Sequence, residues 1–201
     1  MSHAAGHAIS DEALDIIFRT ARSHNRWTDQ PVSDAHLMAL YDLLRWGPTS
    51  GNSCPARFLF LTSAEAKERL KPHLDKGNQE KSVTAPALAI IGYDLDFPKT
   101  LIKLAPHNPK AADHYAGKPE LARTDAFRNG TLEGAYLIIA ARALGLDCGP
   151  MGGFDRDGVD KEFFAGTNIK SNFLCALGHG KTDALRPRAP RLSFDEACKI
   201  L

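Results

Sequence analysis

Three arginines lie close together near the end of the chain, in the segment Arg186, Pro187, Arg188, Ala189, Pro190 and Arg191. A guanidinium group presents a planar set of N–H donors that suits phosphate or carboxylate, and a hydrogen bond to a charged group contributes about 1.5–3 kcal/mol. The two prolines exclude a helix and stiffen the backbone, so less entropy is lost on binding. The segment therefore predicts an anion-binding site, with a solvated basic tail as the alternative.

Three other segments follow predicted helices and offer polar groups or glycines that could contact a ligand. They are Arg22, Ser23, His24, Asn25 and Arg26; Pro48, Thr49, Ser50, Gly51 and Asn52; and Gly149, Pro150, Met151, Gly152, Gly153, Phe154 and Asp155. Each alone also has a structural explanation, namely basic residues at a helix end, a turn, and a tight connection in which glycine saves space. Spacing alone leaves both explanations open.

Several motifs with a known chemistry are absent from the sequence. Residues 178–182 end in Gly-Lys-Thr, but Cys175 stands where a P-loop needs its first glycine. No Gly-x-Gly-x-x-Gly follows a predicted strand, and the histidines form no zinc motif. No Gly-x-Ser-x-Gly elbow is present either. We therefore expect neither a metal nor a catalytic nucleophile from the protein.

Composition limits the classes of partner. The 201 residues carry 25 basic and 24 acidic side chains, so the net charge of +1 gives no general attraction for nucleic acid. No apolar run approaches the roughly 20 residues of a membrane span, and the first ten residues do not resemble a secretory signal. The four cysteines are far apart in the sequence, a pattern that suggests no disulfide framework and is typical of a protein in a reducing compartment. The sequence predicts a cytoplasmic protein with no nucleic-acid or membrane partner.

Apolar periodicity divides the chain into elements of a single domain, residues 1–201, whose first ten residues we expect to be flexible. Helices are predicted over residues 11–22, 34–46, 63–74 and 124–145, and strands over residues 57–62, 86–93 and 172–177. The last helix is apolar on nearly every face and should be the buried central helix. Prolines interrupt residues 94–123, which predicts an excursion or lid over a site, or else a plain surface insertion.

Taken together and in this order, the four candidate segments resemble the flavin-dependent nitroreductase family, and within it the branch of malonic semialdehyde reductases. The resemblance covers residues 11–201 and is strongest over residues 22–27, 48–58, 145–155 and 185–192. It implies an α+β fold with a mainly antiparallel sheet between helices, in an intertwined homodimer with both active sites at the interface. The chain departs from many members at Cys54-Pro55-Ala56, where they have Gln-Pro-Trp, and at Ala21, where an arginine is expected.

The same resemblance implies a tightly bound FMN and assigns residues to it. The phosphate would be held by the first segment and the C-terminal basic pair, that is by Arg22, Ser23, His24, Asn25 and Arg26 with Arg186 and Arg188. The isoalloxazine edge would be met, partly from the partner subunit, by Pro48, Thr49, Ser50 and Asn52. The segment Pro150, Met151, Gly152 and Gly153 would lie along the flavin near its N5.

The activity implied by the resemblance is an oxidoreductase in which NADH or NADPH reduces the flavin, leaves, and is replaced by a small acceptor. The acceptor would be malonic semialdehyde, giving 3-hydroxypropionate, or a nitroaromatic or quinone. A cation of the excursion, Lys99, Lys103 or Arg123, could pair with the carboxylate of the semialdehyde. The alternatives are a non-catalytic FMN carrier, a flavin-sensing dimer, or a module that binds a small anion without flavin.

Overall fold

A four-stranded antiparallel sheet forms the centre of this computed structural model, which describes residues 7–201. The strands are β1 (Ala56–Leu61), β2 (Ala87–Asp94), β3 (Asp147–Met151) and β4 (Ile169–Gly178), in the order β1-β2-β4-β3. Every neighbouring pair is antiparallel. The expectation of an antiparallel sheet is therefore confirmed. The sequence predicted three of these strands and missed β3.

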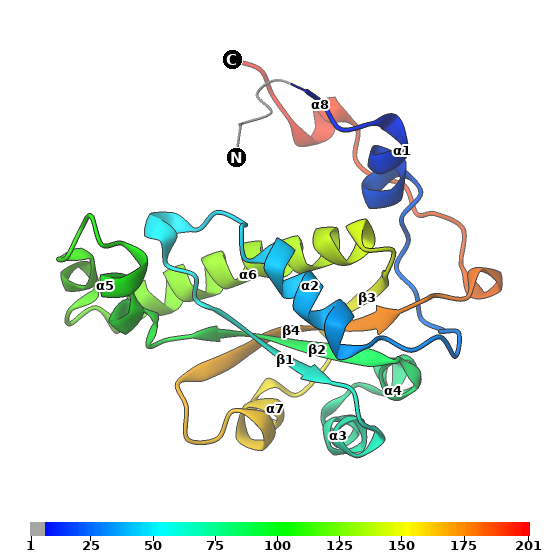
Figure 1. Ribbon diagram of the computed structural model, residues 1–201, viewed down its shortest axis with the longest axis horizontal. Helices are drawn as coiled ribbons and strands as arrows, with labels where there is room; N and C mark the ends of the chain where they lie inside the picture. The colour runs from blue at the N-terminus through cyan, green and yellow to red at the C-terminus, as the bar shows by residue number, and fades with distance from the viewer. Residues whose placement is uncertain (1–6) are drawn as a thin grey trace.

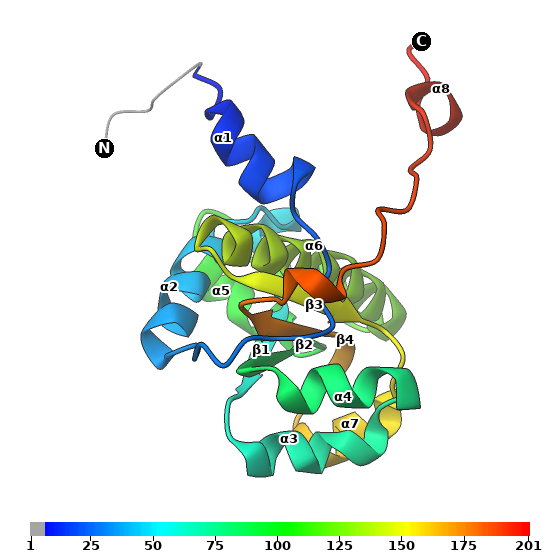
Figure 2. The ribbon, with the colours of Figure 1, turned by 90° about the vertical axis from the view of Figure 1, so that its right-hand side faces the viewer.

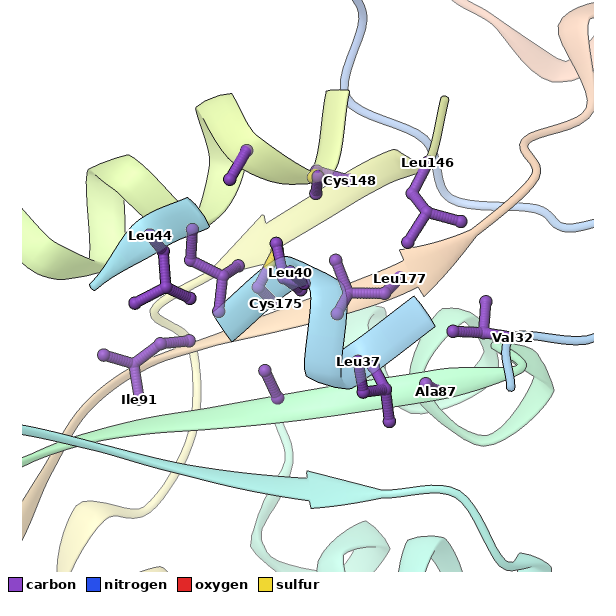
Figure 3. Packing of buried hydrophobic residues seen from close by; sticks show 14 residues of the cluster. Val32, Leu37, Leu40, Leu44, Ala87, Ile91, Leu146, Cys148, Cys175 and Leu177 are labelled. Carbon is purple, nitrogen blue, oxygen red and sulfur yellow. The ribbon is translucent and has the colours of Figure 1, made fainter. Parts of the chain in front are cut away.

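Two layers of helices cover the two faces of the sheet (Figures 1 and 2). On one face lie α2 (Asp34–Leu44) and α6 (Pro119–Ala143). On the other lie α3 (Ala64–Leu70), α4 (Lys76–Thr84) and α7 (Arg156–Phe163). The alternation of side chains along β2 feeds both layers, because Ala87, Ala89 and Ile91 face α2 and α6 whereas Leu88 and Ile90 face the other side. Figure 3 shows the first of these two cores.

The central helix α6 begins five residues earlier than the sequence predicted, at Pro119 rather than residue 124. It ends at Ala143, and Gly145 follows with a φ of 77°, a left-handed position that suits glycine. A Cβ on Gly134 would lie 2.5 Å from the ring of Phe173, so glycine there lets the helix approach the sheet closely. The helix is not buried on every face, as Leu132 and Tyr136 are among its exposed apolar residues.

Residues 94–118 form a separate small unit at the N-terminal end of α6. It contains α5 (Leu101–Leu104) between the 3₁₀ turns Phe97–Thr100 and Ala111–Tyr115. Its own core gathers Phe97 and Leu101 against Tyr93 of β2 and Ala126 of α6. The last residues of the predicted excursion belong instead to the first turns of α6.

Helix α1 and the C-terminal arm run away from the body of the molecule (Figure 2). The first helix is short: α1 (Asp11–Leu14) continues as the π-helical turn Asp15–Arg19 and stops three residues before the predicted end. The C-terminal arm carries the single turn α8 (Phe194–Ala197). Residues 7–10 are exposed and irregular, whereas the predicted flexibility of residues 1–6 lies outside the described residues. No helix within residues 7–201 has the length and apolarity that a bilayer span requires.

Candidate functional site

Four arginines meet in a cavity of about 330 Å³ between the two terminal segments of the chain. We call it the arginine pocket; it is lined by Phe18, Ala21, Arg22, Ser23, Arg142, Arg188, Ala189 and Arg191. Arg142 comes from the last turn of α6, and its Nε is buried without a hydrogen-bond partner in the described part of the chain. Three of the sequence-predicted residues, Arg22, Ser23 and Arg188, are thus brought together.

Backbone carbonyls hold this pocket in place. Residues after the π-helical turn lie beside β3, since Ser23 forms a parallel bridge with Cys148 and His24 N–H donates to the Cys148 carbonyl at 2.9 Å. The guanidinium of Arg188 donates to the carbonyls of Arg19 and Ala21, at 2.9 and 2.8 Å. Arg22 in turn donates to the carbonyl of Arg186. Residues 19–22 and 186–188 therefore hold each other beside the sheet, because their arginines donate to neutral backbone carbonyls of the other segment.

A second basic cavity, also of about 330 Å³, contains the other predicted cations. We call it the lysine pocket; it is lined by Asn25, Arg26, Gly77, Glu80, Lys81, Ala184 and Arg186. Trp27 anchors α4 beside it, because its Nε1 donates to the Lys81 carbonyl at 2.9 Å. Burial lowers the pKa of Lys81 from its ordinary value. The set of phosphate ligands expected from the sequence is therefore divided between two pockets.

The charge of both pockets is unbalanced. Within residues 7–201, no carboxylate forms an ion pair with Arg22, Arg142, Arg188 or Arg191, and none does so with Arg26, Lys81 or Arg186. Glu80 is the one acidic residue in the two lining sets. Like charges that converge without counter-charges repel one another, so an anion bound in either pocket would relieve this repulsion.

His24 lies behind the pockets rather than in either of them. Its side chain is almost completely buried, with Nε2 3.3 Å from the carboxylate of Asp147. A Cβ on Gly180 would collide with its ring, so the imidazole packs directly against that backbone. It lines neither basic pocket, but together with Arg22 and Arg142 it lines a third cavity of about 290 Å³.

The end of β3 brings Pro150 and Met151 toward α4. The hydroxyl of Ser82 donates to the sulfur of Met151 at 3.3 Å, and Asn78 Nδ2 donates to the Gly153 carbonyl at 2.8 Å. A Cβ on Gly153 would collide with Asp75, whereas one on Gly152 would meet no protein atom within 4 Å. The surface of Gly152 is thus open to a ligand.

The predicted loop that starts at Pro48 lies away from the arginine pocket, beside the first half of α6 and the end of α5. The N–H of Ser50 donates to Asn129 Oδ1 at 2.8 Å, in the first half of α6, and Asn52 Nδ2 donates to the Leu104 carbonyl at 2.8 Å. Thr49 Oγ1 accepts from the Cys54 N–H at 3.1 Å. Asn129 and Arg142 are thirteen residues apart in α6, about 20 Å along its axis. One chain therefore does not bring this loop to the arginine pocket.

Sequence reasoning missed two cations that the structure adds, Arg142 and Lys81. Arg142 lies in a helix that the sequence predicts to be apolar on nearly every face, and its place at the end of that helix matches no motif. Lys81 belongs to α4, whose sequence Lys-Gly-Asn-Gln-Glu-Lys-Ser-Val-Thr has too little apolar periodicity to indicate a helix. In the part of the chain that the structure describes, no group of three or more His, Cys, Asp or Glu side chains is arranged to hold a metal ion.

Comparisons with known proteins agree on one family. A model of the nitroreductase family matches residues 18–181. Two relatives, from Stenotrophomonas maltophilia and Cupriavidus pinatubonensis, carry the provisional name NADH dehydrogenase/NAD(P)H nitroreductase. They are 56% and 53% identical over 194 and 193 residues, which is 96% and 95% of this chain and 98% of each relative. The crystal structure of a nitroreductase-like protein from Exiguobacterium sibiricum in complex with FMN matches with a TM-score of 0.83, at 21% identity, over 97% of this chain and 99% of that one.

A buried carboxylate beside the predicted loop gives a testable pH dependence. Glu133 is 6% exposed, and burial raises its pKa above the ordinary value, although the Ala56 N–H and Arg57 oppose the shift. As pH rises from about 4.5, the unfolded carboxyl ionises before the folded one, so this group stabilises the fold less and less. Relative to wild type, Glu133→Gln should therefore gain unfolding free energy as pH rises through this window.

Urea unfolding at fixed protein concentration between pH 4 and pH 8 measures this difference. Glu65→Gln, at an exposed position of α3, controls for removal of a carboxylate. A difference between Glu133→Gln and wild type that stays constant or shrinks with rising pH would contradict the assignment.

Proposed function

The chain belongs to the nitroreductase family, and on that premise we propose that it is an FMN-dependent oxidoreductase that uses NADH or NADPH to reduce a small acceptor. The observation that carries the proposal is the arginine pocket, in which four guanidinium groups converge without a carboxylate. The family match and the names of the relatives support the same class of activity.

The arginine pocket fits the phosphate of FMN. A phosphate dianion needs several charge-assisted donors, and Arg22, Arg188 and Ser23 offer them together with the partnerless Nε of Arg142. The pocket lies between two segments that neutral carbonyls already hold in place, so little reorganisation is required on binding. We assign Arg22, Ser23 and Arg188 to the phosphate, as the sequence indicated, and add Arg142.

The lysine pocket fits the other polar end of FMN. Arg26, Lys81 and Arg186 would lie at the N1–C2 edge of the ring, where positive charge stabilises the negative charge that reduction places there. The open backbone of Gly152 would lie along the ring. The chemistry that FMN supplies when bound is hydride transfer between NAD(P)H and a second substrate. The residues of the chain need only bind, orient and supply charge.

The separation of the Pro48 loop from the arginine pocket supports a homodimer with shared active sites. Large apolar side chains are exposed on α2 and just after it, on α6 and on the C-terminal arm; they are Met38, Tyr41, Leu43, Trp46, Phe127, Leu132, Tyr136, Leu192 and Phe194. Exposed apolar surface of this extent marks an interaction site. In the proposed dimer, this surface meets a second copy, and the loop of one subunit completes the site of the other.

We further propose malonic semialdehyde as the acceptor, with nitroaromatics or quinones as the alternative. The small unit of residues 94–118 contacts the Pro48 loop through the Asn52–Leu104 hydrogen bond. Of its candidate cations, Lys99 is paired with Asp96 at 2.9 Å. Lys103 and Arg123 are exposed and form no ion pair within residues 7–201. These two of the three predicted cations, one in the small unit and one in the first turns of α6, remain unpaired in the described part of the chain for the carboxylate of the semialdehyde.

The FMN assignment predicts the effect of removing one guanidinium. Arg188→Ala should weaken FMN binding by about tenfold to a hundredfold, because it removes charge-assisted hydrogen bonds to the phosphate. The FMN affinity of Arg188→Lys should lie between those of wild type and Arg188→Ala, since lysine keeps the charge but lacks the planar set of donors. Fluorescence titration of the apoprotein with FMN measures the affinities.

Arg69→Ala is the matched control for that titration, because Arg69 pairs with Glu162 on the far helical layer. If the Arg188→Ala protein binds FMN as tightly as the Arg69→Ala protein, the assignment of the phosphate to the arginine pocket is wrong.

The acceptor assignment is tested by steady-state turnover. We expect the wild type to reduce malonic semialdehyde, and Lys103→Met combined with Arg123→Met to raise KM for it by about tenfold or more, because an opposite charge is lost. The same double variant should reduce an uncharged quinone with unchanged KM. Absence of wild-type turnover on the semialdehyde would leave the nitroaromatic or quinone alternative.

A further inference from the structure

We propose that Asn129 and Glu133 of α6 are positioning residues, which hold residues 50–56 in the conformation that completes the cofactor site of the partner subunit. The inference rests on the proposed function, because it takes the loop to serve an FMN site. It adds a role for two side chains that contact neither basic pocket.

The two side chains hold the loop at both of its ends. Asn129 Oδ1 accepts from the Ser50 N–H at 2.8 Å, and Glu133 Oε2 accepts from the Ala56 N–H at 2.9 Å. They are four residues apart, so they project from the same face of the helix. One rigid helix therefore fixes the spacing between the first and last residues of the segment.

Both acceptor side chains are buried, and each accepts a hydrogen bond from the backbone of the loop. Asn129 is fully buried and Glu133 is 6% exposed, and polar groups so deeply buried cost free energy unless they are hydrogen-bonded. The amide of Asn129 orients its oxygen by donating from Nδ2 to the Asp125 carbonyl at 2.8 Å. Within the described residues, the carboxylate of Glu133 has one hydrogen-bond donor, the backbone of Ala56.

The loop needs such support because its backbone is unusual. Gly51, Asn52 and Cys54 have φ values of 58°, 53° and 40°. For the two residues other than glycine, this left-handed conformation is unfavourable and persists only where the surroundings enforce it.

Two further contacts reinforce the outer side of the loop. Arg57 donates to the Cys54 carbonyl at 3.1 Å and pairs with Asp94 at 2.7 Å. Asn52 Nδ2 donates to the Leu104 carbonyl. The loop is thus fixed from α6 on one side and from β2 and α5 on the other. Ser50 is exposed and its hydroxyl forms no hydrogen bond within the described residues, so it remains available to a partner subunit.

Hydrogen exchange of the full-length protein tests the positioning directly. In Asn129→Ala, the peptide covering residues 47–57 should exchange about tenfold faster than in wild type, because the Ser50 N–H loses its acceptor. Thr124→Ala, at an exposed position of the same helix, is the matched control and should leave that peptide unchanged. Equal exchange in Asn129→Ala and wild type would overturn the inference.

A conservative pair at the second contact provides an independent version of this test. Glu133→Ala should also increase exchange in the same peptide, whereas Glu133→Gln keeps an oxygen acceptor and should restore protection. If Asn129→Ala does not fold, the comparison of Glu133→Ala with Glu133→Gln tests the positioning role on its own. Increased exchange in Glu133→Gln equal to that in Glu133→Ala would overturn the role of the Ala56 contact.

A heterodimer with one damaged loop and one damaged pocket tests which site the loop serves. We expect Asn129→Ala homodimers to keep their FMN but to turn over a quinone with NADPH about tenfold to a hundredfold more slowly, because small misplacements are costly. A heterodimer of an Asn129→Ala subunit with an Arg188→Ala subunit should recover about half of the wild-type turnover, since one site then has an intact pocket and an intact loop.

No recovery in the heterodimer would show that the loop acts within its own subunit and would overturn the inference. Wild-type protein is measured first for FMN content and NADPH oxidation. If it lacks both, the proposed function fails and the inference with it. If it has both and Asn129→Ala has wild-type turnover, the inference alone fails.

Discussion

The arrangement of this protein depends on how it keeps several guanidinium groups close together without acidic partners. The repulsion between Arg22 and Arg188 does not separate the two segments that carry them, because each guanidinium also donates to a backbone carbonyl of the other segment. These bonds fix the irregular residues after the first helix and the proline-rich C-terminal segment on the same end of the sheet. Within residues 7–201, the fold thus holds a cluster of unpaired positive charges in place without a ligand, and in the proposed function the phosphate of FMN supplies the missing negative charge.

The central helix connects this surface with the second half of the proposed site. Its last turn contributes Arg142 to the arginine pocket, while its earlier turns present Asn129 and Glu133 to the Pro48 loop. The two functional regions therefore belong to one rigid element but lie about 20 Å apart. In the proposed homodimer, a second copy of the chain would resolve this separation, because a symmetric pair can place the loop of each subunit at the pocket of the other. The exposed apolar side chains of α2 and α6 would then form the surface of contact.

Much of the fold and part of the site could be predicted from the sequence. Apolar periodicity indicated α2, β2 and the core of α6, because these elements bury continuous or regularly spaced side chains. Strand β3 was missed because Gly149 and Pro150 are poor strand formers. They are tolerated here because β3 is an edge strand, with β4 on one side and, within the described residues, only the isolated bridge of Cys148 to Ser23 on the other. Ordered motifs indicated Arg22 and Arg188, but they did not show that Arg26 and Arg186 belong to a second pocket. That division depends on α4, a polar helix held by tertiary contacts such as the Trp27–Lys81 hydrogen bond, which no local pattern reveals.

The most direct test of the central claim is the visible absorption spectrum of the purified, desalted wild-type protein before and after anaerobic addition of NADH and then NADPH. A flavin-dependent oxidoreductase should show absorption at about 450 nm that bleaches with one of the two nucleotides. A band that persists with both would indicate a flavin carrier rather than an oxidoreductase. A colourless protein that also fails to take up added FMN would contradict the account, and the arginine pocket would then belong to a different anion.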